Sequence, residues 1–281
     1  MAKYGAHAFL WIGDWTTASG NFAIAEAAKI GFDFIEIPLL RPVRFDAQAH
    51  KKALEEAGIY ATASLVLPRE AHMPKEPEKA KKYLIHALDK LEEVGGTYLC
   101  GCLGFALGVF TGKPPTPEER QVVVDTLVEV AFEARKRGIT LGFECVNRYE
   151  GYMYNALADG RDTVKAIGMD NVTLHADTYH MNIEEDGFYK PLVECADVLG
   201  YIHMSESNRG LVGSGNVNWE DVFRGLADAR YKGPLVLESF AAINEDLQSA
   251  TCLWRPPNHP PGVLAREGLK FLRTRAEQVG L

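Results

Sequence analysis

The sequence contains no apolar run long enough to cross a bilayer. A membrane helix needs roughly 18 or more consecutive apolar residues, and no window of this chain approaches that length. The amino terminus, MAKYGAHAFLW, has one lysine and passes directly into a strand-like run, without the apolar core and cleavage site of a signal peptide. We therefore expect a cytoplasmic protein with no membrane partner.

Clustered positive charge is also missing. The chain has 30 Lys and Arg against 38 Asp and Glu, a formal net charge of -8, whereas nucleic-acid-binding domains usually gather Lys and Arg on one surface. A metal-dependent nuclease of the endonuclease IV type would also need more histidine ligands, and few of the eight histidines fall at strand ends. The sequence therefore predicts no nucleic-acid partner.

Neither a disulfide framework nor a dinucleotide fingerprint is present. The five cysteines are an odd number and are scattered along the chain. Cys100 and Cys102 share one face of a predicted strand and have no second pair nearby, which favours small buried apolar residues over a zinc site. No G-x-G-x-x-G follows the first strand-like run, although a doubly wound sheet would usually show one there.

What the chain does contain is an alternation of β-rich runs and amphipathic helical stretches. Its 281 residues, 47% apolar and 24% charged, are an ordinary globular composition that buries a full core. The predicted strands are 4–11, 32–38, 59–67, 97–104, 140–146, 172–178, 198–205 and 234–240. The predicted helices are 19–30, 46–57, 76–94, 117–137, 159–168, 188–196, 218–229 and 262–278.

Turn and cap residues divide these runs into repeated βα units. Glycines stand where a helix must stop before the next strand, a position that favours a left-handed backbone; they are Gly31, Gly58, Gly95, Gly138 and Gly168. Helix starts are indicated by Pro77 and Pro117, and by Asp159 and Asn218 as N-caps. Eight such units predict a single-domain α/β protein, a (β/α)8 TIM barrel over 1–281; an open doubly wound sheet is the alternative.

Each of the last four predicted strands carries, near its carboxyl end, a side chain that can bind a metal or transfer a proton. Glu144, Asp177, His203 and Glu238 fall near the carboxyl ends of strands 5 to 8, where this fold carries its chemistry. Desolvating an unpaired carboxylate is costly, so a group of them predicts a bound cation. Three carboxylates and one imidazole favour Mn²⁺, Mg²⁺ or Co²⁺ over a thiolate zinc site; the alternative is that each is a separate salt-bridge partner.

Longer segments around these residues resemble the ketose 3-epimerases. FECVNRYEGYMYN (143–155), HADTYHMNIEE (175–185), HMSESNRGLVGSGNVNW (203–219) and LVLESF (235–240) are similar to the metal-site segments of the D-tagatose, D-psicose (D-allulose) and L-ribulose 3-epimerases, within the xylose-isomerase-like barrels. The resemblance covers most of the chain in length and βα order, with its diagnostic motifs in 143–240.

This resemblance implies a set of site residues. It implies that Glu144, Asp177, His203 and Glu238 bind one divalent metal per subunit, usually Mn²⁺, and that Glu150, His180 and Arg209 contact the substrate near its carbonyl end. In the first strand it places His7, where some members have an aromatic residue, and Trp11 near the far end of the sugar. It also implies a homodimer or a homotetramer.

The implied reaction is epimerisation of a free ketose at C3. Such a reaction removes the proton α to the carbonyl and returns it on the opposite face of a planar enediolate, so that two bases are needed. Glu144 and Glu238, on non-adjacent strands, are the predicted pair, and a cation chelated by O2 and O3 would stabilise the developing charge. The alternative for both glutamates is a purely ligating role.

Other readings of the chain stay open. An aldose-ketose isomerase of the hydroxypyruvate- or xylose-isomerase type is the alternative enzyme, and a non-catalytic sugar-binding barrel is a third possibility. His175 is interpreted as a buried, hydrogen-bonded histidine beside the ligands, and Glu36 at the end of strand 2 has no assigned role. The Pro-rich run 255–262 indicates a lid or a subunit contact.

Overall fold

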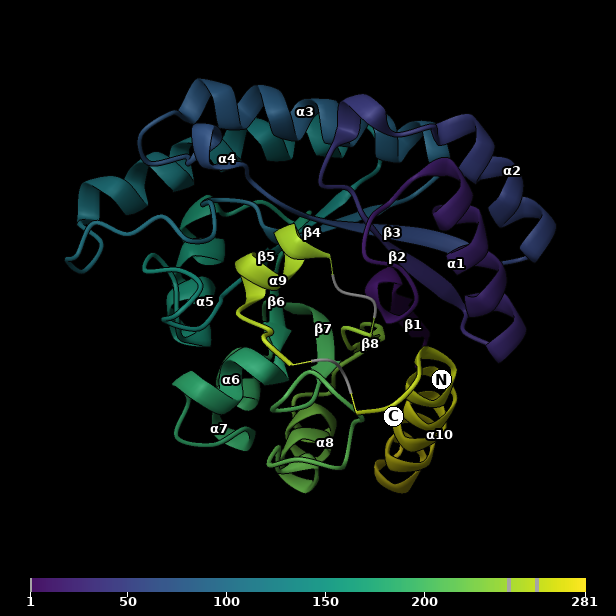
Figure 1. The fold of residues 1–281 in the computed structure, drawn as a ribbon. Helices are drawn as coiled ribbons and strands as arrows, with labels where there is room; N and C mark the ends of the chain where they lie inside the picture. Colours follow the sequence, from purple (N-terminus) through teal and green to yellow (C-terminus); the bar gives the residue numbers. More distant parts are fainter. Residues whose placement is uncertain (1, 242–243, 256–257) are drawn as a thin grey trace.

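The computed structural model describes residues 2–241, 244–255 and 258–281, and its strands close into one parallel barrel (Figure 1). Each strand pairs with the next along the chain, and the last pairs with the first. The strands are β1 (Tyr4–His7), β2 (Phe34–Pro38), β3 (Tyr60–Val66), β4 (Tyr98–Cys102), β5 (Thr140–Glu144), β6 (Val172–Asp177), β7 (Leu199–Ser205) and β8 (Leu235–Glu238). The predicted (β/α)8 barrel is confirmed.

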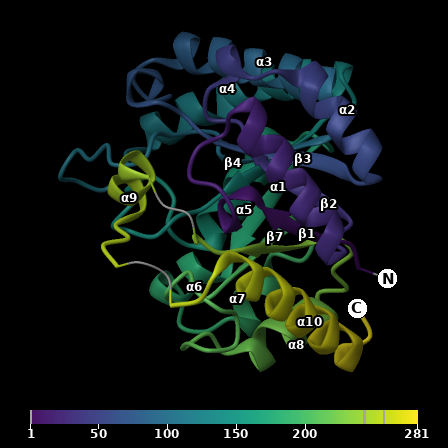
Figure 2. The same ribbon diagram turned by 45° about the vertical axis from the view of Figure 1, so that its right-hand side comes forward.

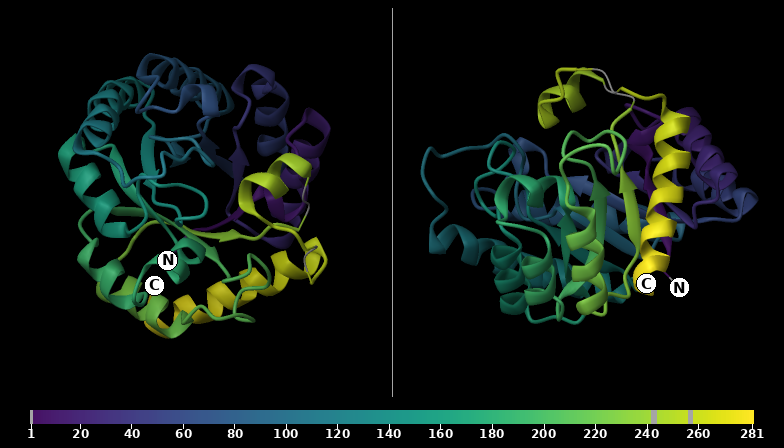
Figure 3. Two further views of the ribbon diagram at one scale, coloured as in Figure 1. Left: turned by 60° about the vertical axis from the view of Figure 1, so that its left-hand side comes forward. Right: turned by 90° about the horizontal axis from the view of Figure 1, so that it is seen from below.

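Helices surround this barrel (Figures 1 and 3). They are α1 (Thr17–Ile30), α2 (Ala47–Ala57), α3 (Pro77–Val94), α4 (Pro117–Lys136), α5 (Leu157–Ile167), α6 (Thr178–Glu184), α7 (Tyr189–Glu194), α8 (Trp219–Asp228), α9 (Glu245–Thr251) and α10 (Pro261–Val279). Short 3-10 turns are η1 (Ala8–Leu10), η2 (Pro42–Arg44) and η3 (Arg69–Ala71). Helices α6 and α9 are absent from the pattern-based prediction.

The predicted caps are mostly confirmed. Four of the five glycines are left-handed C-caps, and Gly138 has the same backbone one residue beyond the cap of α4. Asn218 caps α8 through its side chain. The assignment of Asp159 as an N-cap is wrong, because α5 begins earlier, after Ala156, and Asp159 reaches back to the Ala156 N–H from the first turn.

Residues along each strand alternate between two separate cores. Ile35, Leu99, Ile202 and Leu237 belong to the large cluster between the sheet and the helices. Their chain neighbours Phe34, Cys100, Tyr201 and Val236 form a second, smaller cluster. Since successive strand residues point to opposite faces, this second cluster fills the inside of the barrel. The same alternation turns the side chains of Glu36, Glu144 and His203 inward.

The first strand is shorter than the predicted 4–11. It ends at His7, whose Nδ1 accepts a hydrogen bond from the Phe9 N–H at 3.2 Å and so starts the turn η1. Helix α6 likewise begins directly after β6, because Asp177 Oδ1 accepts the Tyr179 N–H at 2.7 Å. Local side-chain caps at both sites therefore end the extended run.

The ends of the chain and α9 lie at opposite ends of the barrel. The views agree in placing the two termini near each other, on the side where the strands begin, whereas α9 lies across the end where the strands finish (Figures 2 and 3). The described residues between β8 and α10 therefore border the mouth of the barrel. Residues 242–243, and residues 256–257 within the suggested lid or subunit contact at 255–262, lie outside the described residues. Among the described residues, no helix is long and apolar enough to cross a membrane.

Candidate active site

Three strand ends and one position two residues before a strand end bring the predicted acidic and imidazole groups together in one buried cluster. Glu144, Asp177 and Glu238 are the last residues of β5, β6 and β8, and His203 pairs with Asp177 across β6 and β7. Ligand atoms of Glu144, Asp177 and His203 lie within 4.8 Å of one another. Oε1 of Glu238 lies 3.2 Å from Nδ1 of His203. The four are called the acidic cluster below, and each is buried.

The acidic cluster fits a divalent cation. Among the described residues, Oδ2 of Asp177 is buried without a hydrogen-bond partner, and the nearest contact of Nδ1 of His203 is the ion pair with Oε1 of Glu238. Buried polar atoms are seldom left unpaired, and both of these atoms belong to the same group of converging donors. Carboxylate oxygens with one imidazole nitrogen suit a hard or borderline divalent ion.

Burial and neighbouring charges shift the pKa values of the three carboxyl groups in this cluster in different directions. Burial raises the pKa of Glu144 well above its usual value, although His203 opposes the shift, and the charges of Asp177 and Glu238 add to it. Burial likewise raises the pKa of Asp177, to about 8. For Glu238 burial acts in the same direction, but the charges of Arg209 and His203 prevail and hold its pKa well below the usual range. Without a metal, Glu144 is therefore driven towards its protonated form and Glu238 towards its ionised form.

Arg209 lies over this cluster from the loop that follows β7. Its guanidinium is enclosed by two rings, with Cζ 4.0 Å from the centroid of Tyr179 and 4.5 Å from that of Phe240. Nη1 donates to Oε2 of Glu238 at 2.5 Å, and Nη2 donates to Oε1 of Glu150 at 3.4 Å. The planar donor fork thus joins two buried carboxylates in one geometry.

Glu150 and His180, both expected near the substrate carbonyl, meet at the same side of the cavity. Asn147 connects them: its Nδ2 donates to Oε1 of Glu150 at 3.0 Å and lies 2.8 Å from Nδ1 of His180. The Asn147 N–H also donates to Nδ1 of His180 at 3.0 Å, and Nη2 of Arg209 lies 3.4 Å from Nε2 of the same ring. Burial and the charge of Arg209 lower the pKa of His180 well below 6.5, so the ring is neutral.

A cavity of about 590 Å³ opens above the acidic cluster. Its lining includes Glu144, Glu150, His180, His203, Arg209 and Glu238. His7 and Phe9 also line it. Trp11 does not: it is buried, with its ring 6.2 Å from that of Phe32 and almost perpendicular to it. The early end of β1 turns the chain through η1, so Trp11 packs into the core rather than against the cavity.

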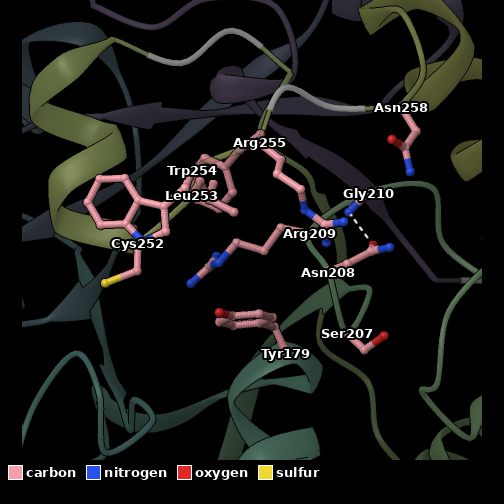
Figure 4. A pocket seen from close by; sticks show the side chains of 11 residues that line it. Tyr179, Ser207, Asn208, Arg209, Gly210, Cys252, Leu253, Trp254, Arg255 and Asn258 are labelled. Atoms are coloured by element: carbon pink, nitrogen blue, oxygen red, sulfur yellow. Dashed lines mark hydrogen bonds between the residues drawn. The ribbon is translucent and has the colours of Figure 1, made fainter.

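A second, smaller cavity of about 370 Å³ adjoins the first and shares Arg209 and Phe240 with it. In Figure 4, Trp254 and Leu253 lie on one side of Arg209 and Tyr179 lies on the other. Arg255 and Asn258 complete its outer part. The segment after α9 thus contributes directly to the surroundings of Arg209.

Comparisons with known proteins show the family to which a chain with this arrangement belongs. The family model of the xylose isomerase-like TIM barrel matches residues 24–275. An L-ribulose 3-epimerase from Methylomonas sp. (strain DH-1) is 38% identical over 279 residues, 97% of this chain and 97% of that protein. The chain belongs to the ketose 3-epimerase family. A ketose 3-epimerase from Arthrobacter globiformis is 33% identical over 259 residues, 90% of this chain and 89% of its own.

A solved member of the ketose 3-epimerase family shares the whole fold. The crystal structure of a D-allulose 3-epimerase from Methylomonas sp. in complex with D-allulose has a TM-score of 0.94 and 38% identity, and the match covers 98% of this chain and 97% of that one. The family resemblance stated from the four segments in 143–240 is therefore confirmed over nearly the full chain.

Two further buried glutamates, Glu36 and Glu206, support the site of this ketose 3-epimerase, although the sequence alone indicated no role for either. Glu36 accepts hydrogen bonds from His203 Nε2 and Tyr201, at 2.8 and 2.7 Å. Burial raises its pKa, but the charge and hydrogen bond of His203 prevail and bring it to about 2. A charged residue on an inward strand position was the only signal for it.

Glu206 organises the loop that carries Arg209. Its carboxylate accepts hydrogen bonds from the N–H groups of Ser207, Gly213 and Val217 and from the indole of Trp219. Its backbone carbonyl accepts the Arg209 N–H at 2.8 Å. Arg209 has a left-handed backbone with φ of 54°, which costs about 1–2 kcal/mol, so the surrounding hydrogen bonds maintain it.

His175 is buried as expected, but not hydrogen-bonded. Both of its ring nitrogens lack a partner among the described residues. Its ring stands almost perpendicular to that of His203, with centroids 4.2 Å apart. The His175 ring therefore packs edge to face against the imidazole of His203.

Proposed function

We propose that this protein is a metal-dependent carbohydrate 3-epimerase that interconverts a free 2-ketose and its C3 epimer. One observation carries the proposal: Glu144 and Glu238, buried carboxylates from non-adjacent strands, converge with Asp177 and His203 and both face the cavity. Removing and returning a proton on two faces of one carbon requires two such groups.

The two glutamates are the proposed catalytic pair. Carboxyl groups whose surroundings drive their pKa values apart are suited to act as acid and base. In one direction Glu238 takes the C3 proton and Glu144 delivers a proton to the opposite face, after which Glu238 is protonated and Glu144 ionised. In the reverse direction the roles exchange.

A divalent cation is proposed at the acidic cluster, held by Glu144, Asp177, His203 and Glu238. Mn²⁺ is the proposed ion, with Co²⁺ and Mg²⁺ as alternatives, because the donors are mostly hard oxygens. When bound, the ion supplies Lewis-acid stabilisation of negative charge on the substrate oxygens.

The remaining predicted residues position the sugar. Glu150, neutral His180 and Arg209 form a connected group at one side of the cavity and are proposed to hold the carbonyl end by hydrogen bonds. His7 is proposed to contact the far end of the sugar. Its ring centroid lies 4.7 Å from that of Phe9 and 6.2 Å from that of Phe240. Trp11 is not included, because its ring lies outside the cavity lining.

The reaction is tested in D₂O. Chelated protein re-supplied with Mn²⁺ is incubated separately with D-fructose, D-tagatose and L-ribulose, and the products are identified by NMR. We expect C3 epimers that carry deuterium at C3 and that form only with metal. An aldose product, with exchange at C1 or C2, would instead indicate an aldose-ketose isomerase, and no exchange with any ketose would overturn the proposal.

The same material tests two further proposals. Ranking the three ketoses by kcat/KM identifies the preferred one, and substituting Co²⁺ or Mg²⁺ for Mn²⁺ ranks the ions. A homodimer or homotetramer remains a prediction from the family, and sedimentation velocity measures it directly.

A further inference from the structure

A line of buried hydrogen bonds runs from the inside of the barrel to the acidic cluster. Oγ1 of Thr62 lies 2.8 Å from the Tyr201 hydroxyl, which donates to Oε2 of Glu36 at 2.7 Å. The same Oε2 lies 2.8 Å from Nε2 of His203. The four residues come from β3, β7 and β2, and each is at most 4% exposed.

This line determines which nitrogen of His203 carries hydrogen. A carboxylate oxygen only accepts, and Oε2 of Glu36 already accepts from Tyr201. The hydrogen between Glu36 and His203 therefore belongs to Nε2. The other nitrogen, Nδ1, is then directed at Oε1 of Glu238, 3.2 Å away, and at Oδ2 of Asp177, 4.0 Å away.

The ring has little freedom to turn away from this arrangement. His175 stands against it with ring centroids 4.2 Å apart. His7 has its ring centroid 5.9 Å from that of His203; its Nδ1 accepts the Phe9 N–H, and its Nε2 lies 3.5 Å from Oε1 of Glu36 and 3.2 Å from Ser64 Oγ. Both oxygens of Glu36 thus face imidazole rings, and Glu36 itself is fully buried and absent from the cavity lining.

We propose that Glu36 is a positioning residue for the metal site: it holds His203 with hydrogen on Nε2, so that Nδ1 is the nitrogen offered to the cation. The inference rests on the metal dependence in the proposed function. A carboxylate behind a ligating imidazole fixes the ring and increases the basicity of its free nitrogen. Because Glu36 does not reach the cavity, its effect on the reaction passes through the two imidazoles that it faces, and its effect on the metal site passes through His203.

The test compares Glu36→Gln with a matched control. Glutamine keeps the shape and one acceptor oxygen but removes the charge, whereas Thr62→Val removes the far end of the same line and leaves Glu36 and His203 in contact. Binding of Mn²⁺ to each chelated protein is measured by electron paramagnetic resonance of the free ion. Circular dichroism and the Tm of the metal-free proteins check folding.

We expect Glu36→Gln to bind Mn²⁺ about 10- to 100-fold more weakly than the wild type, and Thr62→Val to bind as the wild type does. At saturating Mn²⁺, KM of Glu36→Gln stays at the wild-type value. Equal Mn²⁺ affinities of Glu36→Gln and wild type would overturn the inference while leaving the proposed function intact. Failure of the wild type to bind Mn²⁺ would overturn the metal dependence and this inference together.

A second measurement is made on the wild-type protein, and a variant serves only to assign its signals. Nitrogen-15 NMR of the histidine rings is recorded with and without Mg²⁺, a diamagnetic ion, and the His203 signals are identified by their loss in His203→Asn. We expect Nε2 of His203 to carry hydrogen in both states and Nδ1 to carry none in the Mg²⁺-saturated protein. Hydrogen on Nδ1 in the Mg²⁺-saturated protein would contradict the proposal.

Discussion

Nη1 of Arg209 lies 2.5 Å from Oε2 of Glu238, which joins the loop after β7 to the last residue of β8. The other oxygen of Glu238 faces His203. A proposed base is thereby held between two cationic groups, and the negative charge that burial would otherwise remove is retained. The carbonyl of Arg209 accepts from Ser239 and Phe240, so the ion pair and the backbone reinforce each other.

Removing the guanidinium should affect both stability and substrate binding. Arg209→Ala leaves Glu238 and Glu150 buried without their cation, and we expect a loss of about 3 kcal/mol in the free energy of unfolding of the metal-free protein. We also expect a larger rise in KM than fall in kcat, because Arg209 belongs to the group proposed to hold the carbonyl end. Urea unfolding and steady-state kinetics measure the two effects. Arg224→Ala, which removes an exposed pair with Asp221, is the control and should change little.

The two-base mechanism is tested by amide substitutions. Glu144→Gln and Glu238→Gln should each lower kcat by about 10²- to 10⁴-fold, because an amide neither takes nor returns the C3 proton. Mn²⁺ content is measured in the same samples, since both residues are also proposed ligands. Glu56→Gln, on the exposed face of α2, should retain wild-type turnover. Near-normal turnover in either site variant at full Mn²⁺ occupancy contradicts the proposed pair.

Metal affinity should rise with pH. The raised pKa values of Glu144 and Asp177 mean that the metal-free cluster holds protons near neutrality, and His203, whose pKa is raised by Glu36 and Glu238 against the effect of burial, holds another. A cation must displace these protons, so that acid competes with binding. Calorimetric titration with Mn²⁺ between about pH 6 and 9 should give a Kd that falls as pH increases, with proton release. A pH-independent Kd would show that the ligands are already ionised.

Glu206 should stabilise the protein in a pH-dependent way. Burial raises its pKa, but hydrogen bonds from three backbone N–H groups and the Trp219 indole outweigh this and lower it. A lowered pKa in the folded state gives stability that is present above the unfolded value of about 4.3 and is lost as pH falls through the folded value. Glu206→Gln should therefore cost at least about 2 kcal/mol at pH 7, and less as the pH decreases below about 4.

Thermal unfolding of Glu206→Gln and wild type across pH checks this prediction, with Glu56→Gln as the control at an exposed position. The difference in Tm should narrow in acid. A constant difference would mean that the substitution acts through packing rather than through the charge. A loss of kcat/KM in Glu206→Gln is also expected, because the loop that maintains the left-handed backbone of Arg209 depends on this carboxylate.

Local patterns in the chain were enough to predict the eight strands, although not the early end of the first. Period-two alternation identified Glu144 as an inward residue at the end of a strand, and parallel strands place such ends at one edge of the barrel. The same reasoning brought Asp177, His203 and Glu238 together before any contact was known. The prediction of Asp159 as an N-cap failed, because α5 begins about one turn earlier than the pattern indicates. Where the backbone leaves the extended form is not set by the local pattern alone.

The sequence by itself determined the (β/α)8 fold and the residues of the acidic cluster, because both follow from periodicities and strand ends that are local in the chain. Only the tertiary structure decided the contact between Glu36 and His203, which are 167 residues apart, the exclusion of Trp11 from the cavity, and the position of Arg209 between Tyr179 and Phe240. These depend on barrel closure, on the turn after β1 and on a loop held by Glu206. Such contacts arise from the summed geometry of many elements, and no local pattern encodes them.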